Sequence, residues 1–189
     1  MDTFLRDTSM LNRIATTVLL LTICCRVLTG IAQDQEFGSG SFAGYDVYIP
    51  APGPSINLTD RVGWLRVSTP PSQKFDHWTD VDNAPQLRRN LTMGDWQLET
   101  SMEVIYATGP EFHSGLIVYF SRYDLFYWGF NGGYSTLKLS RSGQGGLIST
   151  AYSGGTAVQL RVRKVGTTYY FDYKALGDPD WTQAGSQTT

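Results

Sequence analysis

The chain has 189 residues, of which 15 are basic and 17 acidic, giving a formal net charge of −2 at neutral pH. This balance argues against nucleic acid or an anionic membrane as partner, because both attract a clear excess of positive charge. Aromatic residues make up 13% of the chain and can supply the bulk that a thin core between two layers needs.

Residues 1–32 are predicted to be a secretory signal peptide. A short apolar run, residues 14–25, follows two arginines, and small residues precede a cut expected after Ala32. The run is well short of the roughly twenty apolar residues that a membrane-spanning helix needs. A lipoprotein cut at Cys24 or Cys25 is the alternative. We therefore expect a secreted or extracytoplasmic protein with no membrane attachment after signal cleavage.

The mature chain would contain no cysteine, because both cysteines lie in the signal peptide. Its stability must then come from its core and not from disulfides. Cleavage leaves about 157 residues, the size of one domain. It also removes three arginines and two aspartates, which leaves 12 basic and 15 acidic residues and a net charge of −3. Neutral ligands suit this charge.

The domain itself is expected to begin after a short flexible lead-in. Residues 33–44 are rich in Gly and Ser, and the domain is assigned to residues 45–189. A proline-rich bend and a loop over 74–85 separate the first elements. These elements are short strands predicted at 45–49, 62–68 and 86–91.

The clearest strand pattern lies in the middle of the chain. From Trp96 to Val104 the apolar side chains occupy every second position, so one face packs and the other meets water. The runs 115–120 and 125–130 are apolar on both faces, which is typical of central strands, and residues 121–124 join them in a tight hairpin. Alternating segments bounded by turn residues follow at 135–141, 146–151, 157–165 and 167–175.

About ten short strands at regular spacing, with no segment of helical period, predict an all-β fold. The expected architecture is an antiparallel β-sandwich of two sheets, or a jelly roll.

Three ordered segments resemble a known family. They are SINLTDRVGWLRVSTP (residues 55–70), DNAPQLRRNLTMGDWQLETSMEV (82–104) and SGLIVYFSRYDLFYWGF (114–130). They resemble the concanavalin A-like domain at the C-terminus of family 43 glycoside hydrolases such as β-xylosidases, and a related uncharacterised family of the same fold. The resemblance covers residue 45 to the end. It implies a concanavalin A-like jelly roll that binds poly- or oligosaccharide, with a catalytic domain as a possible partner.

The chain departs from this family in two respects. No five-bladed catalytic propeller precedes the domain, and the chain ends at Thr189, where such domains usually continue for one or two strands. We therefore expect a C-terminally truncated sandwich. A strand beginning near Trp181 would then be left as an unpaired edge.

Glu99 and Glu103 are the candidate catalytic pair. Residues i, i+2 and i+4 of a strand share one face, and two carboxylates there could act on a glycosidic bond. The spacing resembles the E-x-D-x-E signature of concanavalin A-like endoglucanases, with Ser101 in place of the middle acid. The two Cα atoms would lie about 13 Å apart, far beyond the roughly 5 Å between the carboxyl groups of a retaining enzyme. Two solvated glutamates on a polar strand face are the simpler interpretation.

The central hairpin provides a candidate sugar platform. A two-residue turn at Arg122 and Tyr123 would place Tyr119 opposite Phe126 and Ile117 opposite Trp128. One aromatic face would then pack in the core and the other would line a groove, where flat rings suit the apolar faces of sugars. The predicted ligand-binding residues are Tyr119, Phe126, Trp128, Glu99 and Lys138. The alternative is that these rings fill the core.

Three aspartates in the loop FDHWTDVDN are weak metal candidates. Asp76, Asp80 and Asp82 offer the oxygen ligands that Ca²⁺ prefers, although the loop lacks the glycine and distal glutamate of a helix-loop site. A solvated acidic loop is the alternative, and no other cofactor is expected. The two histidines show no zinc-binding spacing. Asn57 and Asn90 begin glycosylation sequons.

Three functions therefore remain open at the level of sequence. We favour an exported, non-catalytic carbohydrate-binding or glycoside-hydrolase accessory domain. The alternatives are a glycoside hydrolase that uses Glu99 and Glu103, and a structural or interaction module without a sugar site.

Overall fold

The computed structural model describes residues 41–42, 44–71, 73–78, 80–91, 94–105 and 112–189. These residues belong to one unit of the chain, Gln35–Thr189. The predicted signal peptide and most of the lead-in lie outside the described residues, so both stay predictions. The described residues form fourteen strands and no helix, and hence no helix long and apolar enough to cross a bilayer.

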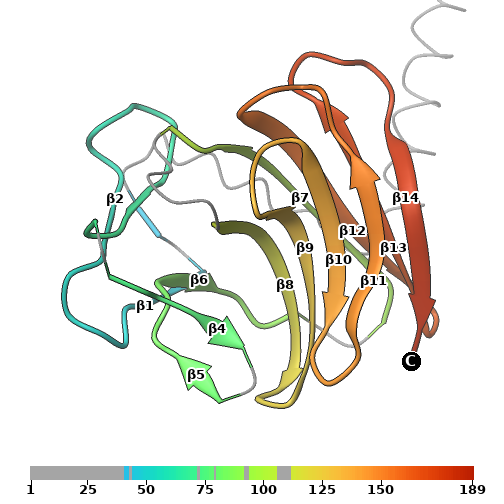
Figure 1. Cartoon of the computed structure of the whole chain (residues 1–189), viewed down its shortest axis with the longest axis horizontal. Helices are drawn as coiled ribbons and strands as arrows, with labels where there is room; N and C mark the ends of the chain where they lie inside the picture. Colours follow the sequence, from blue (N-terminus) through green and yellow to red (C-terminus); the bar gives the residue numbers. More distant parts are fainter. Residues whose placement is uncertain (1–40, 43, 72, 79, 92–93, 106–111) are drawn as a thin grey trace, which may run out of the picture. The chain divides into compact units, whose positions relative to one another are not determined.

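Four consecutive strands form the first large sheet. Its order is β11-β10-β9-β8, and each strand runs antiparallel to its neighbour, as Figure 1 shows. Short turns join strands that are adjacent in sequence, which is the connection that antiparallel pairing permits. The strands are β8 (His113–Ser121), β9 (Asp124–Asn131), β10 (Thr136–Arg141) and β11 (Gly145–Ala151).

The second large sheet combines three consecutive strands with one from earlier in the chain. Its order is β14-β13-β12-β7, again antiparallel (Figure 1). These strands are β7 (Trp96–Glu103), β12 (Ala157–Val165), β13 (Thr168–Ala175) and β14 (Thr182–Thr188). The strand pattern after residue 135 was predicted to within one residue at each end. β14 is an edge strand that begins directly after Trp181.

The core lies between these two sheets. Alternate side chains of β9 and β10, from the first sheet, pack against alternate side chains of β12 and β13, from the second. Phe126 and Phe171, from opposite sheets, have ring centroids 5.5 Å apart at an interplanar angle of 73°. The prediction of an all-β, antiparallel fold is confirmed, and its arrangement is sandwich-like. The buried core residues from the two sheets include Phe126, Trp128, Phe130, Leu137, Leu139, Val158, Leu160, Val162 and Phe171.

The central hairpin has the predicted turn but a different register. Ser121 lies opposite Asp124, so Arg122 and Tyr123 form the two-residue turn. A bulge then inserts Phe120, so that Tyr119 faces Leu125 and not Phe126. Because side chains alternate between faces, this one-residue insertion exchanges the faces of β8 relative to β9. The predicted grouping of side chains on this hairpin is therefore wrong.

The two strands of this hairpin approach closely at a pair of glycines. Gly115 lies opposite Gly129, and a Cβ atom on either one would collide with the backbone of the other strand. Glycine is the residue that permits such a close approach, so these two positions are fixed by backbone packing.

The N-terminal part of the domain consists of three small antiparallel pairs. β1 (Asp46–Tyr48) pairs with β6 (Gln86–Arg88), and β2 (Ser55–Asn57) pairs with β3 (Arg66–Ser68). The segment 74–85, predicted as a loop, contains the hairpin β4 (His77–Trp78) and β5 (Val81–Asp82). Strands of two residues are too short to show alternation, so this prediction failed.

Candidate functional site

The outward face of the second sheet is polar across three strands. β7 and β12 both alternate, with apolar side chains toward the core and polar side chains outward. The register places Ser101 opposite Gln159 and Glu99 opposite Arg161, while Arg161 lies opposite Asp172 on β13. Pairing therefore brings residues from distant parts of the sequence into two polar rows.

A buried carboxylate anchors this surface. Asp172 is only 1% exposed, and its Oδ2 accepts hydrogen bonds of 2.8 Å from both Arg161 Nε and Arg163 Nε. The hydrogen bond to Asp172 raises the pKa of Arg163. Arg161 also lies 3.6 Å from Glu99. Charge-assisted bonds of this kind hold both guanidinium groups in fixed positions.

Trp181 lies against the anchored arginine. Its ring is 4.2 Å from Arg161 Cζ and 5.1 Å from Lys174 Nζ, both cation–π contacts. A bulge in β14 makes Gln183, and not Ala184, the partner of Asp172. An inserted residue of this kind changes the sheet face on which the neighbouring side chains of the bulged strand lie.

Trp181 forms one wall of a shallow hollow on the sheet. The hollow has a volume of about 130 Å³, and its other lining residues are Glu99, Thr100, Ser101 and Gln159. Gln159 Nε2 donates to Ser101 Oγ at 2.8 Å, and Gln97 Nε2 donates to Glu99 at the same distance. An indole ring beside carboxylate, amide and hydroxyl groups can contact the apolar face of a sugar and bind its hydroxyls.

The two candidate catalytic glutamates share this outward face, but they form separate ion pairs. Glu103 lies 2.6 Å from Arg61 Nη1, whereas Glu99 is near Arg161. Both carboxylates thus have a guanidinium partner on the protein. Geometry gives no indication that they act together on one bond.

The predicted sugar platform on the central hairpin is not formed. Phe126 and Trp128 are 0% and 1% exposed and belong to the core cluster, so the groove-lining role predicted for them is wrong in this structure. Their β8 partners are Val118 and Leu116, which also lie on the core side, and not Tyr119 and Ile117 as predicted.

The other predicted ligand residues lie apart from one another. Tyr119 is 56% exposed on the outward side of β8, next to His77 at a ring-centroid distance of 5.9 Å. Lys138 is half-buried between the core residues Leu137 and Leu139 of β10 and alternates outward. Of the five predicted residues, only Glu99 lies at the Trp181 hollow.

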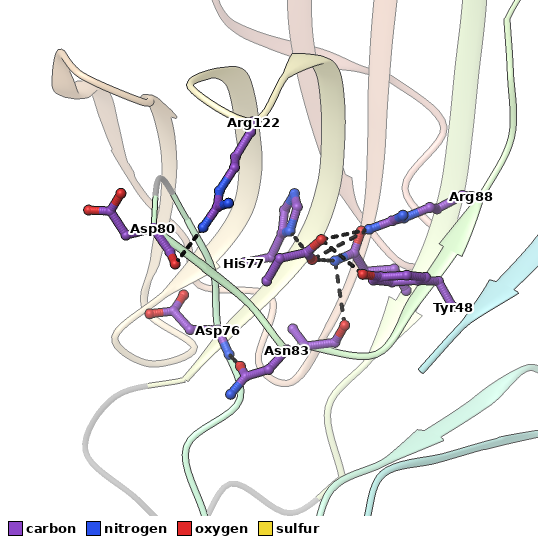
Figure 2. Close-up of polar contacts among 10 residues, drawn as sticks. Tyr48, Asp76, His77, Asp80, Asn83, Arg88 and Arg122 are labelled. Carbon is purple, nitrogen blue, oxygen red and sulfur yellow. Dashed lines mark hydrogen bonds and ion pairs between the residues drawn. The ribbon is translucent and has the colours of Figure 1, made fainter. Parts of the chain in front are cut away.

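A second polar cluster joins the small N-terminal strands. The side chains of Tyr48, His77 and Arg88 all bond to the carboxylate of Asp82. Figure 2 shows these three side chains directed toward one another. His77 Nδ1 lies 2.7 Å from Asp82 Oδ1, and the Tyr48 hydroxyl donates to Oδ2 at 3.1 Å. Burial raises the pKa of Asp82, but these hydrogen bonds and the nearby charges outweigh burial and lower it. Because the partners come from β1, β4 and β6, the cluster acts as a structural joint.

The three candidate metal ligands do not come together in this cluster. The Asp76 carboxylate pairs with Lys74 at 3.4 Å, and Asp80 accepts a bond from Arg122 through its backbone oxygen (Figure 2). The described residues contain no group of three or more His, Cys, Asp or Glu side chains arranged to hold a metal. A calcium ion here stays a prediction.

Sequence reasoning missed Trp181, Arg161 and Asp172 as site residues. The sequence pattern that could have indicated Arg161 and Asp172 is the alternation in residues 157–165 and 167–175. There, charged side chains occupy outward positions between buried apolar ones.

Comparison of the chain with protein-family models, with curated proteins and with solved structures gives no match. The resemblance to the C-terminal domain of family 43 glycoside hydrolases is therefore still a prediction.

Proposed function

We propose that this protein is a carbohydrate-binding domain whose contact surface is the outward face of β7, β12 and β13, centred on Trp181. The main observation that supports this proposal is the position of the indole ring of Trp181. It is held over a guanidinium group that a buried carboxylate fixes, beside a hollow lined by Glu99, Ser101 and Gln159. A ring that is held in place before binding loses little conformational entropy when a ligand arrives.

The chemistry of the surface favours a neutral, hydroxyl-rich ligand. Asp172 and Glu99 together offset the positive charge of Arg161 and Arg163, so the face carries no excess of one charge. The hollow is shallow and open, which suits a chain lying across the sheet better than an enclosed small molecule.

Three more specific parts of the proposal, namely the fold family, the export of the chain and its accessory role, rest on the sequence. We propose a concanavalin A-like jelly roll, an exported chain and an accessory role beside a catalytic domain, on the resemblance described above. The antiparallel sheets are compatible with such a fold.

Calorimetric titration with xylan- and glucan-type oligosaccharides tests the binding function. We expect Trp181→Ala to weaken binding at least tenfold, about 1.4 kcal/mol, with little change in melting temperature. Tyr123→Ala is the control, because Tyr123 is an exposed aromatic residue that also lies against an arginine, but it belongs to the β8–β9 turn and does not line the Trp181 hollow. Tyr123→Ala should bind like the unmodified protein.

Three other results would contradict the proposal in different ways. Loss of binding in Tyr119→Ala but not in Trp181→Ala would move the site to the other sheet. Hydrolysis of a polysaccharide that disappears in Glu103→Gln would favour the glycosidase. Absence of binding to any glycan would favour a structural module.

A further inference from the structure

A second and larger hollow lies at one end of the two sheets. It is formed where the connection between β11 and β12 meets the connection between β13 and β14, and Figure 1 shows both at the same end. Its volume is about 300 Å³, against about 130 Å³ for the Trp181 hollow. The side chains that matter in its lining are Tyr152, Ser153, Tyr173, Lys174, Asp178 and Thr182.

Several polar side chains of this hollow make no hydrogen bond or ion pair within the described part of the protein. Ser153, Asp178 and Thr182 make no side-chain hydrogen bond or ion pair with a described residue, and the Lys174 ammonium group lies against the ring of Trp181. In the Trp181 hollow, by contrast, Ser101 and Gln159 bond to each other. Unpartnered polar groups at an open surface bind water, which the hydroxyls of a ligand can replace.

Two tyrosines give the hollow an aromatic wall. The rings of Tyr152 and Tyr173 are 6.1 Å apart with an interplanar angle of 78°. The Tyr152 hydroxyl donates to the Ala157 carbonyl oxygen, which fixes the ring. Tyr152 is 7% exposed and Tyr173 is partly buried against the core, so the hollow offers a limited but rigid aromatic surface beside its polar groups.

The two hollows share no lining residue, but they are linked by the contact between Lys174 and Trp181. Trp181 lines the first and Lys174 the second, and the two side chains are in contact. In the sheet, Ser101, Gln159 and Lys174 lie directly across from one another on β7, β12 and β13. Two interstrand steps of about 4.8 Å separate Ser101 from Lys174, so the row spans roughly 10 Å.

We propose that the second hollow is a further subsite, which binds the next units of the same linear, uncharged oligosaccharide whose first units contact Trp181. This inference rests on the proposed function. One lysine and one aspartate line the subsite, so it offers both donors and acceptors without favouring a charged sugar.

Affinity as a function of glycan length tests the subsite. Dissociation constants are measured for a xylan-type or glucan-type series from disaccharide to hexasaccharide. We expect affinity to rise at least tenfold along the series in the unmodified protein. The double variant Ser153→Ala, Asp178→Asn should lose this rise and keep the disaccharide affinity. Asp180→Asn is the matched control, because Asp180 is exposed in the same connection but does not line the hollow.

The possible failures are distinguishable. Affinity that is independent of length in the unmodified protein, or a rise that persists in the double variant, would overturn the second subsite and leave the Trp181 site standing. A protein that binds no member of the series would overturn both proposals.

Discussion

Trp128→Ala should destabilise the domain strongly, because the indole lies wholly within the core. Trp128 is 1% exposed and packs against the ring of Phe171 at 6.2 Å. Truncating a buried aromatic residue to alanine typically costs about 3 to 5 kcal/mol. The indole Nε1 also donates to the Asp172 carbonyl oxygen at 3.0 Å, and the loss of this hydrogen bond adds about 0.5 to 1.5 kcal/mol.

Such a loss is large relative to the total stability of a domain, about 5 to 15 kcal/mol. At this chain length each kcal/mol of lost stability lowers the melting temperature by roughly 2 to 4 °C. Truncation of the buried side chain alone should therefore lower it by about 6 to 20 °C. The assay is a thermal melt followed by circular dichroism. A urea titration in parallel would show whether the slope with denaturant is unchanged, as expected for a change in stability alone.

A Trp128→Ala variant that melts close to the unmodified protein but loses carbohydrate binding would refute this reasoning. That result would mean that Trp128 lies on an open face. Trp181→Ala is the comparison, since its ring is held on the surface mainly by the cation–π contact with Arg161, worth about 0.5 to 2 kcal/mol. We therefore expect Trp128→Ala to lower the stability of the domain, and Trp181→Ala to weaken carbohydrate binding with little loss of stability.

Three further perturbations have defined outcomes. Asp172→Asn should cost about 3 to 5 kcal/mol in a chemical denaturation experiment, because two guanidinium groups lose their buried partner; a loss below 1 kcal/mol would contradict this. Gly115→Ala should lower the melting temperature more than Gly146→Ala, whose added Cβ would meet no atom within 4 Å; equal melting temperatures would argue against the close strand approach. The Asp82 contribution to stability is present above the unfolded pKa of 3.8 and is lost as pH falls through the lower folded pKa. Stability measured from pH 7 downward should thus fall less steeply below pH 4 in Asp82→Asn than in the unmodified protein.

The strands of the second half could be predicted because their alternation is regular. From residue 158 to residue 162 every second side chain is apolar, and each of these, Val158, Leu160 and Val162, is buried. The central hairpin was harder, since its runs 115–120 and 125–130 carry no polar side chain except the tyrosine hydroxyls, on either face. There the register depends on a single inserted residue, Phe120, for which the sequence gives no sign.

The candidate site could not be predicted because it depends on pairing between distant strands. Arg161 meets Glu99 and Asp172 only once β12 lies between β7 and β13. Trp181 directly precedes β14, and its ring contacts Arg161. A bulge at Ala184 sets which residues of β14 pair with β13, and the sequence alone does not reveal this bulge. The cluster around Asp82 likewise needs a hairpin of two-residue strands, which is below the length at which periodicity is informative.

The position of β7 in the second sheet has a consequence for the order of folding. Glu103 pairs with Ala157, roughly fifty residues later in the chain, whereas β8 to β11 and β12 to β14 form from neighbouring hairpins. During synthesis β7 emerges long before β12, the one strand with which it pairs among the described residues. The apolar face of β7 therefore stays uncovered while the first sheet forms. Closing so long a loop is slow, and we expect docking of β7 to be a late step in folding. A chain stalled before β12 would expose the edge and apolar face of β7, which makes this strand the first place at which chaperones or aggregation would act.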